Sequence, residues 1–378
     1  MELLALPGPS GGEEPVADFL CRRLIAAGAP RSAIVRDAPP KGSPVSSSVG
    51  NVVVKLPGTR RGPRQLFSAH MDTVPICAGA CPVRRGRRIV AADRRTGLGG
   101  DDRAGCAVLL ATALELLRTK APHPPLTFLW TVQEEVGLHG ARTAKLALLG
   151  RPQAGFNWDG GSASRVTVGA PGGYRLAITL AGIASHAGGH PEDGVSAIAI
   201  ASLAIAELVQ NGWHGLIEKG ARRGTSNVGV IAGGAATNVV TDRVDLRAEA
   251  RSHDPQFRAR IVHEIEQAFH RAARQVKNAA GRTGAATIRG QLDYEAFRLA
   301  PDHPAVLRAS AAISAEGEKP ELIVANGGLD ANWLTARGIP TVTPGCGQNA
   351  IHTAEEWLDL DEYQRALQVA LRIATGPC

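Results

Sequence analysis

The sequence predicts an α/β protein with a mostly parallel sheet, into which a second segment of α+β character is inserted. Between residues 50 and 170, short apolar runs alternate with helix-like stretches, as in a parallel sheet. The alternation stops at Pro171-Gly172-Gly173 and resumes from about residue 293. A chain of 378 residues also exceeds one ordinary core, so two domains are expected. The boundaries that follow are 1–172 and 293–378 for the outer domain and 173–292 for the inserted domain.

The outer domain is expected to begin with a loop and a helix over 15–27, with Glu13 at the positive end of the helix dipole. Three apolar runs, NVVVKLP, QLFSAH and LTFLWTV, then predict strands, and a helical pattern covers 103–117. In the C-terminal part, ELIVAN and IPTVTP predict strands, with helices near 330–337 and over 361–373. This alternation favours a parallel sheet with helices between its strands.

The inserted segment has a different order of elements. Helical patterns cover 195–210 and 257–275, and four runs have strand character: YRLAITLAGI, TSNVGVIAG, RVDLRAEARS and AATIRGQL. The resulting order, β-α-β-β-α-β, is that of a ferredoxin-like split unit. We therefore expect the inserted domain to be a ferredoxin-like α+β domain.

The composition of the chain bears on its expected location in the cell. The apolar content of 44% is typical of folded globular proteins. The longest apolar stretches fall short of the roughly 20 residues that a membrane span needs, and the N-terminus lacks the pattern of a secretory signal. Six scattered cysteines without a C-x-x-C pair fit reduced thiols, so we expect a cytoplasmic protein. A disulfide between Cys77 and Cys81 is the open alternative.

The net charge of +7 raises the question of a nucleic-acid partner. The positive charge comes largely from arginine clusters, such as Arg84-Arg85, Arg87-Arg88 and Arg222-Arg223. Aromatic residues, on which the bases of single strands stack, make up only 4% of the chain and do not interleave with these clusters. We therefore expect solvated loops, with neither a nucleic-acid nor a membrane partner, and at most a weak preference for anionic substrates.

The pair Glu134-Glu135 is the most informative feature of the chain. It follows an apolar run that ends in Val132 and reads as a buried strand. Burying two charges at the carboxyl edge of a sheet is costly unless a cation or a proton compensates them. Because neighbouring strand residues point to opposite faces, one carboxylate could hold a metal while the other handles a proton. For the pair alone, a solvated acidic turn remains the alternative.

Four further segments combine apolar or glycine-rich runs with residues that bind metals. Open α/β sheets bind their ligands at the carboxyl ends of strands, so these segments could converge. Imidazole and carboxylate ligands together suit zinc, manganese or cobalt. The residues concerned are His70 and Asp72 in QLFSAHMDTVP, Asp101 and Asp102 in TGLGGDDRAG, Asp159 in AGFNWDGG and His352 in IPTVTPGCGQNAIHTAEEW.

Such a set supports hydrolysis of an amide without a covalent intermediate. Two metal ions close together lower the pKa of a shared water toward neutrality, about 7 for a single catalytic zinc. A carboxylate within hydrogen-bond reach can take the proton of that water, and the metals stabilise the developing oxyanion. The chain has no G-x-S-x-G elbow and no cysteine in a recognisable catalytic context, so a protein nucleophile has little support.

Together these residues belong to a recognisable pattern. The chain resembles the M20 family of dinuclear zinc peptidases and amidohydrolases, and within it the peptidase T-like branch. The resemblance implies a zinc-exopeptidase-like catalytic domain at 1–172 and 293–378 and a lid or dimerisation domain at 173–292. The matching stretches run from about residue 50 to the end: SAHMDTVP, GGDDRAG, VQEEVGLHGA, FNWDGG, SHAGGHPEDGVSAI, TNVV, EARSHD and GGLDANWLTARGIPTVTPGCGQNAIHTAEEW.

The resemblance implies two zinc ions per chain, with manganese or cobalt as possible substitutes. It also implies a role for each matching residue. His70 and Asp159 would bind the first zinc, Glu135 and His352 the second, and Asp101 would bridge both, while Asp72 would orient His70 and Glu134 would be the general base. Arg103 stands where the family often has lysine. Both are cations, so no loss of metal is expected, although their geometries differ.

In the inserted domain, the resemblance implies three contacts with substrate. His186 would donate to the substrate carbonyl or oxyanion, in some relatives from a partner subunit, and Asn238 would add a second polar contact. Arg251 would clamp a substrate carboxylate, for which a guanidinium fork is suited. Each also has a plain structural explanation, as a turn residue or an exposed strand end. In the outer domain, Asp330 and Asn332 are candidates to line the pocket, with helix N-capping as an equal explanation for Asp330.

The sequence therefore predicts a cytoplasmic zinc exopeptidase that acts on short peptides, most simply an aminopeptidase of the tripeptidase type. A homodimer through the inserted domain is compatible with it. One alternative is an M20 amidohydrolase, deacylase or carboxypeptidase acting on N-acyl or N-carbamoyl amino acids. A more remote alternative is a metal-binding scaffold without catalysis, against which stands the presence of every metal position and of the base.

Overall fold

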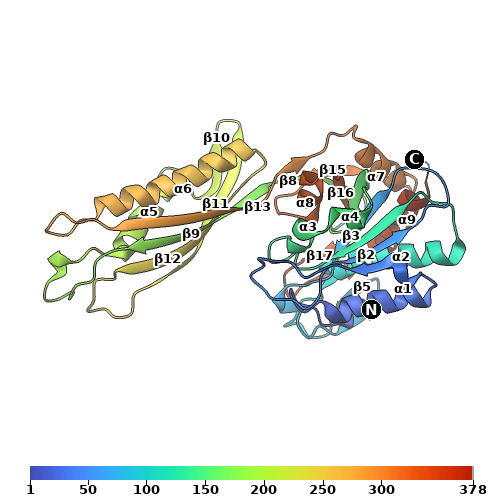
Figure 1. The fold of residues 1–378 in the computed structure, drawn as a ribbon, viewed down its shortest axis with the longest axis horizontal. Coiled ribbons are helices and arrows are strands. Elements are labelled where there is room, and N and C mark those ends of the chain that lie inside the picture. Colours follow the sequence, from blue (N-terminus) through green and yellow to red (C-terminus); the bar gives the residue numbers. More distant parts are fainter. Residues whose placement is uncertain (377–378) are drawn as a thin grey trace. The chain divides into compact units, whose positions relative to one another are not determined.

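The computed structural model describes residues 1–376, which form two compact units. Unit 1 comprises Met1–Ala170 and the described residues from Phe297 onward, and unit 2 comprises Pro171–Ala296 (Figure 1). Each unit has its own hydrophobic core. The boundaries expected from the sequence, 172/173 and 292/293, lie a few residues from those of the structure. Unit 2 is thus an insertion into unit 1 along the chain.

Within the described residues, the main sheet of unit 1 has nine strands in the order β1-β2-β6-β3-β7-β16-β8-β14, with β15 also paired to β8. The four central strands β6, β3, β7 and β16 run parallel, whereas most flanking pairs are antiparallel. The predicted α/β fold class is confirmed. The strands are β1 (Ile34–Arg36), β2 (Val52–Leu56), β3 (Gln65–His70), β6 (Leu126–Thr131), β7 (Ala154–Asn157), β8 (Arg165–Ala170), β14 (Phe297–Arg298), β15 (Glu321–Val324) and β16 (Thr341–Pro344).

The helices of unit 1 include every helix expected from the sequence, with ends shifted by a few residues, and some that were not expected. The 11-residue α7 is the main omission, although its buried residues recur at helical spacing, at Ala305, Val306, Ala309, Ala312 and Ile313. The helices are α1 (Glu14–Ala26), α2 (Gly100–Thr119), α3 (His139–Thr143), α4 (Leu146–Leu149), α7 (Pro304–Ser314), α8 (Asp330–Ala336) and α9 (Leu360–Thr375), with short 3-10 turns at Leu3–Ala5, Arg31–Ala33 and Pro75–Cys77.

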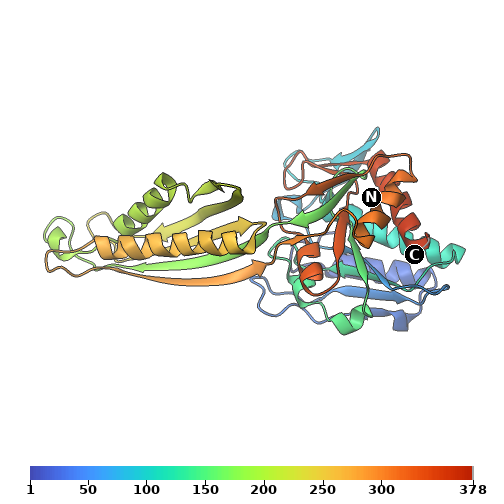
Figure 2. The same cartoon turned by 90° about the horizontal axis from the view of Figure 1, so that it is seen from above.

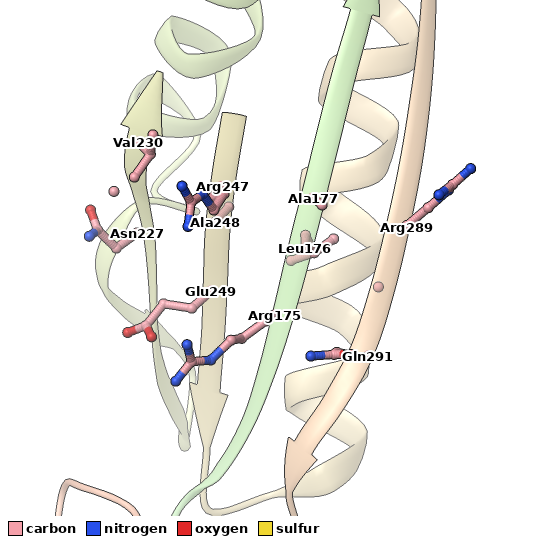
Figure 3. A pocket seen from close by; sticks show the side chains of 12 residues that line it. Arg175, Leu176, Ala177, Asn227, Val230, Arg247, Ala248, Glu249, Arg289 and Gln291 are labelled. Atoms are coloured by element: carbon pink, nitrogen blue, oxygen red, sulfur yellow. The ribbon is translucent and has the colours of Figure 1, made fainter. Parts of the chain in front are cut away.

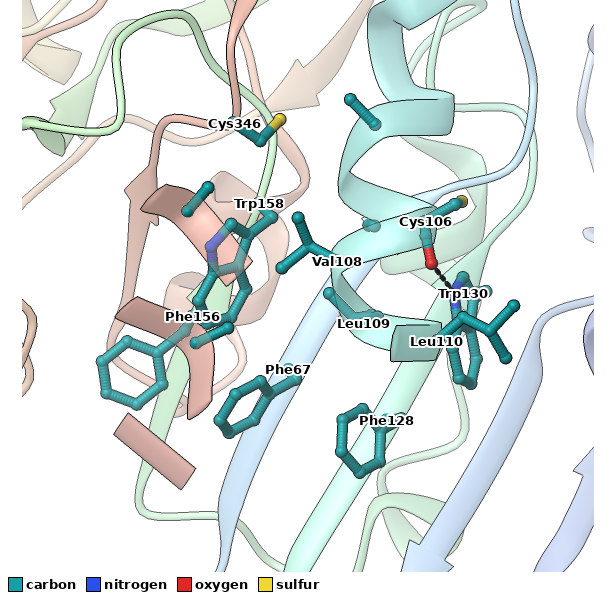
Figure 4. Close-up of a cluster of buried hydrophobic side chains, with 14 of the residues drawn as sticks. Phe67, Cys106, Val108, Leu109, Leu110, Phe128, Trp130, Phe156, Trp158 and Cys346 are labelled. Carbon is teal, nitrogen blue, oxygen red and sulfur yellow. Dashed lines mark hydrogen bonds between the residues drawn. The ribbon is translucent and has the colours of Figure 1, made fainter. Parts of the chain in front are cut away.

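A layer of aromatic side chains fixes helix α2 against the sheet. All six residues of β3 and of β6 are buried, as expected for central strands covered on both faces. Phe67 lies 5.0 Å from Trp158 and 5.3 Å from Phe128 between ring centroids, and Val108 and Leu109 of α2 belong to the same buried cluster (Figure 4). Rigid packing of this kind holds the N-terminus of α2, and therefore Asp101, in a fixed place.

A second, smaller sheet in unit 1 has the order β17-β18-β5-β4 and was not expected from the sequence. Its strands are β4 (Pro82–Arg85), β5 (Arg88–Ala91), β17 (Gln348–Asn349) and β18 (Trp357–Asp359). Arg84, Arg85 and Arg88 therefore lie on a β-hairpin and not in loops, although their side chains are exposed as expected. The guanidinium of Arg88 lies 3.7 Å from the ring centre of Trp357, a cation–π contact between β5 and β18.

Unit 2 is an antiparallel sheet in the order β10-β11-β12-β9-β13, with two helices whose side chains share its core (Figure 2). Without β10, the chain follows the predicted β-α-β-β-α-β order, so the ferredoxin-like fold is confirmed. Strand β10 was missed because its five residues are largely exposed and lie between two turn glycines. The elements are β9 (Gly172–Ala181), α5 (Ala197–Gln210), β10 (Gly215–Lys219), β11 (Arg222–Gly233), β12 (Arg243–Ser252), α6 (Pro255–Gln275) and β13 (Ala285–Tyr294), with a 3-10 turn at Pro191–Asp193.

Two further expectations concern membranes and disulfides. In the described part of the chain, no helix combines the length and the apolar character that a membrane span requires. The five cysteines among the described residues are free thiols, so Cys77 and Cys81 are not joined and the alternative disulfide is wrong. The sixth cysteine, Cys378, lies outside the described residues.

Candidate metal centre

The residues predicted to bind metal converge at one edge of the main sheet. His70 is the last residue of β3, and Asp159 follows the end of β7 by two positions. The two glutamates do not end β6, as the sequence suggested, because the strand stops at Thr131 and they lie in the turn that follows. The five predicted ligands and the predicted base line one cavity of about 360 Å³ in unit 1: His70, Asp101, Glu135, Asp159 and His352, with Glu134 as the base.

Asp101 lies between the two histidines. Its Oδ1 is 3.1 Å from Nε2 of His70, and its Oδ2 is 3.1 Å from Nε2 of His352. The two oxygens of one carboxylate thus face two different imidazoles. This is the arrangement that a ligand shared by two metal ions requires.

The remaining ligands divide between the two sides of Asp101. Asp159 Oδ1 lies 4.0 Å from His70 Nε2, and Glu135 Oε1 lies 3.1 Å from His352 Nε2. Zinc bonds of about 2.0–2.2 Å in tetrahedral geometry place neighbouring donors roughly 3.3 Å apart. The two donor groups, His70–Asp101–Asp159 and Asp101–Glu135–His352, therefore fit two divalent cations that share Asp101.

The concentration of buried carboxylates perturbs every acid and base of the cluster. Burial, with neighbouring carboxylates, raises the pKa of Asp159 and Glu134 well above the ordinary range. Burial alone would lower the pKa of His70, but hydrogen bonds to Asp101 and Asp72 raise it well above its usual value. Hydrogen bonds to Asp101 and Glu135 raise the pKa of His352 to about 10. Without metal, protons therefore supply the positive charge that the carboxylates need.

Asp72 connects the metal ligands to the two glutamates. Its Oδ1 lies 3.4 Å from Nδ1 of His70 and accepts the backbone N–H of Glu134 at 3.0 Å. Its Oδ2 accepts the backbone N–H of Glu135 at 3.2 Å and the hydroxyl of Ser10 at 2.7 Å. The carboxylate of Asp72 thus lies beside the ring of His70 and holds the turn that carries both glutamates.

Two buried acids hold the backbone around the site, a role that the sequence did not predict for them. Asp102 Oδ2 accepts the backbone N–H of His70 at 3.0 Å, and its Oδ1 accepts Nε2 of Gln348 at 2.8 Å. Glu13 was expected to face the dipole of α1. Instead it is buried and accepts the backbone N–H of Gln133 at 3.0 Å. The position of Asp102 next to Asp101 was a signal in the sequence, whereas Glu13 gave none, because its partner Gln133 lies 120 positions away.

Asp330 and Asn332 do not have the predicted roles. Asp330 is buried, accepts the hydroxyl of Thr131 and is the first residue of α8, whose N-cap is Leu329. Burial raises the pKa of Asp330 to about 6. Asn332 Oδ1 accepts the backbone N–H of Leu329 at 2.9 Å. Among the described residues it is their neighbours Gly327, Gly328 and Leu329 that line the cavity.

In unit 2, the structure brings His186 and Asn238 into neighbouring segments. The backbone N–H of Ala187 donates to the carbonyl of Asn238 at 2.9 Å. The exposed ring of His186 accepts the backbone N–H groups of Gly188 and Gly189 at Nδ1, at 3.2 and 2.8 Å. In the neutral ring the proton is therefore on Nε2, which is left to donate.

Arg251 lies at the other end of unit 2. Strand β12 pairs Arg243 with Ala181 near the His186 segment, and it pairs Arg251 with Gly173 eight positions later. At about 3.3 Å per residue, these ends are roughly 26 Å apart. Arg251 is half-buried and donates from Nε and Nη2 to Glu249, each at 3.0 Å. The structure therefore does not bring Arg251 together with His186 and Asn238 of the same chain.

A larger hollow, of about 520 Å³, lies on the sheet of unit 2 and differs in character from the metal centre. Arg175, Arg247 and Arg289 contribute to its lining, together with Glu249 (Figure 3). Figure 3 shows Arg175 and Glu249 extending toward the same side, whereas Arg289 points away from them. Glu249 is the one carboxylate in its described lining and lies among three arginines, so this hollow is positively charged, in contrast to the metal centre.

Comparisons with known proteins identify the family of the chain. Residues 66–376 match the model of peptidase family M20/M25/M40. The chain is 33% identical to the protein YqjE of Bacillus subtilis (strain 168) over 86% of this chain and 84% of the relative. A solved aminopeptidase PepT from Bacillus cereus ATCC 10987 shares 31% identity with a TM-score of 0.84, over 99% of this chain and 96% of that one. A tripeptidase from Staphylococcus aureus subsp. aureus Mu50 shares 30% identity with a TM-score of 0.88, over 99% and 95%.

The chain belongs to peptidase family M20/M25/M40. The resemblance to this family and to its peptidase T-like branch, predicted from the sequence motifs, is confirmed. The prediction of an enzyme of the hydrolase class is confirmed with it.

The raised pKa of His352 predicts how zinc affinity depends on pH. With a pKa of about 10, the metal-free ring is protonated at neutral pH, whereas a metal ligand must be neutral. Zinc binding therefore releases a proton, and affinity should rise up to about tenfold per pH unit for each proton released. Calorimetric titration in two buffers of different ionisation enthalpy measures this release. An affinity that is independent of pH would contradict the assignment, and the His352→Ala variant should show a weaker dependence.

Proposed function

We propose that the protein is a zinc-dependent exopeptidase of short peptides, and specifically an aminopeptidase of the tripeptidase type. The observation that carries the proposal is the position of Asp101 between His70 and His352, with the buried Glu134 lining the same cavity. The similarity to an aminopeptidase and to a tripeptidase, each at 30% identity or more over nearly the whole chain, supports the substrate class. Two zinc ions per chain are the proposed cofactors, with manganese or cobalt as substitutes.

The residues of the cavity have different roles in the proposed hydrolysis. When bound, two zinc ions supply an activated water and polarise the scissile carbonyl. Glu134 accepts the proton of the attacking water and returns it to the leaving amine. Asp72 keeps Glu134 in reach, because it holds the backbone N–H of that residue. Burial raises the pKa of Glu134, and nearby positive charge from bound cations would favour its carboxylate form.

Recognition of the peptide carboxylate is proposed for Arg251. The described lining of the 360 Å³ cavity includes neither lysine nor arginine, so a cation must come from elsewhere. A guanidinium has five N–H donors, of which Glu249 uses two, so three remain for a substrate carboxylate. Burial alone would lower the pKa of Arg251, but its bonds with Glu249 raise it, so the side chain stays charged.

His186 and Asn238 are proposed to act in the site of a partner subunit. Within one chain, the end of β12 next to their segments lies roughly 26 Å from Arg251, whereas an extended tripeptide spans only about 10 Å. One copy of the chain therefore cannot place both His186 and Arg251 against the same small substrate. A second copy of the chain removes this difficulty.

Unit 2 has a surface that suits such a homodimer. Ile198, Leu203 and Val209 of α5 are 45%, 40% and 56% exposed, and Ile231 of β11 is 54% exposed. In the described chain, β10 pairs only with the first part of β11, so residues 227–233 have a sheet neighbour on one side alone. An exposed apolar edge strand invites pairing, and a second copy would cover both features.

The alternatives share the metal centre and differ in the substrate. An M20 amidohydrolase, deacylase or carboxypeptidase would need a pocket for an acyl or carbamoyl group instead of a free amine. A scaffold without catalysis would not need Glu134 beside the ligands. We place the protein in the cytoplasm, because its described cysteines are free thiols scattered through a large chain.

The function is tested with the zinc-loaded protein on free-amino tripeptides, N-acetyl amino acids and N-blocked peptides. We predict release of the N-terminal residue from tripeptides and little turnover of the other two. Glu134→Gln should keep both metals and lower kcat by 10²–10⁴-fold or more, because an amide cannot accept the proton. Its matched control, Glu135→Gln, should instead lose metal. Preferred turnover of N-acetyl amino acids would favour the amidohydrolase alternative. If Glu134→Gln lost metal and Glu135→Gln kept it, the roles of the two glutamates would be reversed.

Arg251→Ala should raise KM for tripeptides with a free carboxyl terminus by about one to two decades, the range of a charge-assisted bond. Amidated tripeptides should be affected far less, because they carry no charge at that end. Arg243→Ala is the matched control, since Arg243 lies on the same strand and pairs with Asp245 in the same manner. Equal effects of Arg251→Ala on both kinds of peptide would mean that Arg251 is structural.

Mixed dimers test whether His186 crosses to the partner. His186→Ala and Glu134→Gln should each be inactive or nearly so when alone. If His186 serves the partner's site, a heterodimer of the two variants contains one complete site. Statistical mixing of equal amounts should then recover about a quarter of wild-type activity. No recovery in dimers shown to have exchanged subunits would place His186 in the site of its own chain.

A further inference from the structure

Glu356 is a buried carboxylate in the loop that carries His352. It lies four residues after His352 and directly before β18, and its exposed fraction is only 2%. It does not line the cavity in the described chain, and the proposed mechanism gives it no role. A buried acid at such a place needs partners that compensate its charge.

Those partners belong to the segment that leads into Asp101. Glu356 Oε1 accepts the backbone N–H of Asp101 at 3.0 Å, and its Oε2 accepts the backbone N–H of Gly99 at 2.7 Å. The thiol of Cys77 lies 3.5 Å from the same Oε2. One side chain therefore ties the loop of His352 to the backbone of the shared ligand, 255 positions earlier in the chain.

The loop of His352 depends on this tie. Ala350 and His352 both have left-handed backbone, with φ of 50° and 63°, which non-glycine residues adopt only when their surroundings hold them there. The side chain of His352 is 47% exposed, so packing restrains it little. Asp101 has independent support, because the adjacent Asp102 is held by Gln348 and by the backbone of His70.

We propose that Glu356 is a positioning residue for the metal ion held by Asp101, Glu135 and His352, because it fixes the separation between Asp101 and His352. The ion held by His70, Asp101 and Asp159 depends on it much less, since Asp102 secures that side. This inference rests on the proposed dinuclear function. It predicts that a substitution of Glu356 lowers the zinc affinity of one metal position much more than that of the other.

The test is Glu356→Gln, which keeps the size of the side chain but leaves one backbone N–H facing an amide group that cannot accept. Zinc binding is measured by equilibrium dialysis against a competing chelator, in full-length protein. We expect one of the two zinc affinities to fall about 10–100-fold, the range for a partner that orients metal ligands, while the other stays within a few-fold of wild type. At a free zinc concentration that saturates both positions of the wild type but not the weakened position of the variant, the variant should bind one ion and the wild type two.

Glu355→Gln is the matched control, because Glu355 is the exposed neighbour in the same loop and should leave both affinities unchanged. Glu356→Asp keeps the charge but shortens the reach, and it should weaken the same position to a smaller extent, which keeps the test valid if the Gln variant does not fold. Equal weakening of both positions, or of neither, overturns the proposal. A wild type that binds fewer than two ions would instead overturn the dinuclear function itself.

Discussion

The arrangement of the site depends on how the negative charge of four buried carboxylates is compensated at one edge of the main sheet. Asp101, Glu134, Glu135 and Asp159 line a single cavity, and burial raises the pKa of the last three. Like charges so close together cannot all ionise without a compensating cation. Two divalent ions carry the four positive charges that would balance these carboxylates, whereas protonated imidazoles supply only two. The concentration of buried carboxylates therefore favours the binding of divalent cations at this site.

A second group of acids holds the backbone in place around the four carboxylates of the cavity. Asp72 accepts the N–H groups of Glu134 and Glu135, Asp102 accepts that of His70, and Glu356 accepts that of Asp101. Each of these acids thus fixes the segment from which a cavity residue projects. The aromatic layer under α2 gives these segments a rigid base. The cavity residues are consequently held in place by backbone hydrogen bonds between segments that are distant along the chain.

The cavity residues could be predicted from the sequence, whereas the acids that hold them largely could not. His70 and Asp159 follow short apolar runs, so a local pattern suffices to place them at the strand ends. Glu13 and Glu356 accept N–H groups 120 and 255 positions away, and no local pattern contains such contacts. Strand β10 was missed for a related reason, since pairing with β11 and not its own sequence makes it a strand. The distance between His186 and Arg251 likewise follows from the register of β12, which the sequence alone does not state.

The central claim is that Asp101 is shared by two metal ions. Anomalous diffraction from crystals grown with zinc, recorded on both sides of the zinc absorption edge, tests it directly. The account predicts two zinc peaks about 3.5–4 Å apart, one on each side of the Asp101 carboxylate, with His70 beside one and His352 beside the other. A single peak at saturating zinc, or two peaks of which Asp101 touches only one, would contradict it.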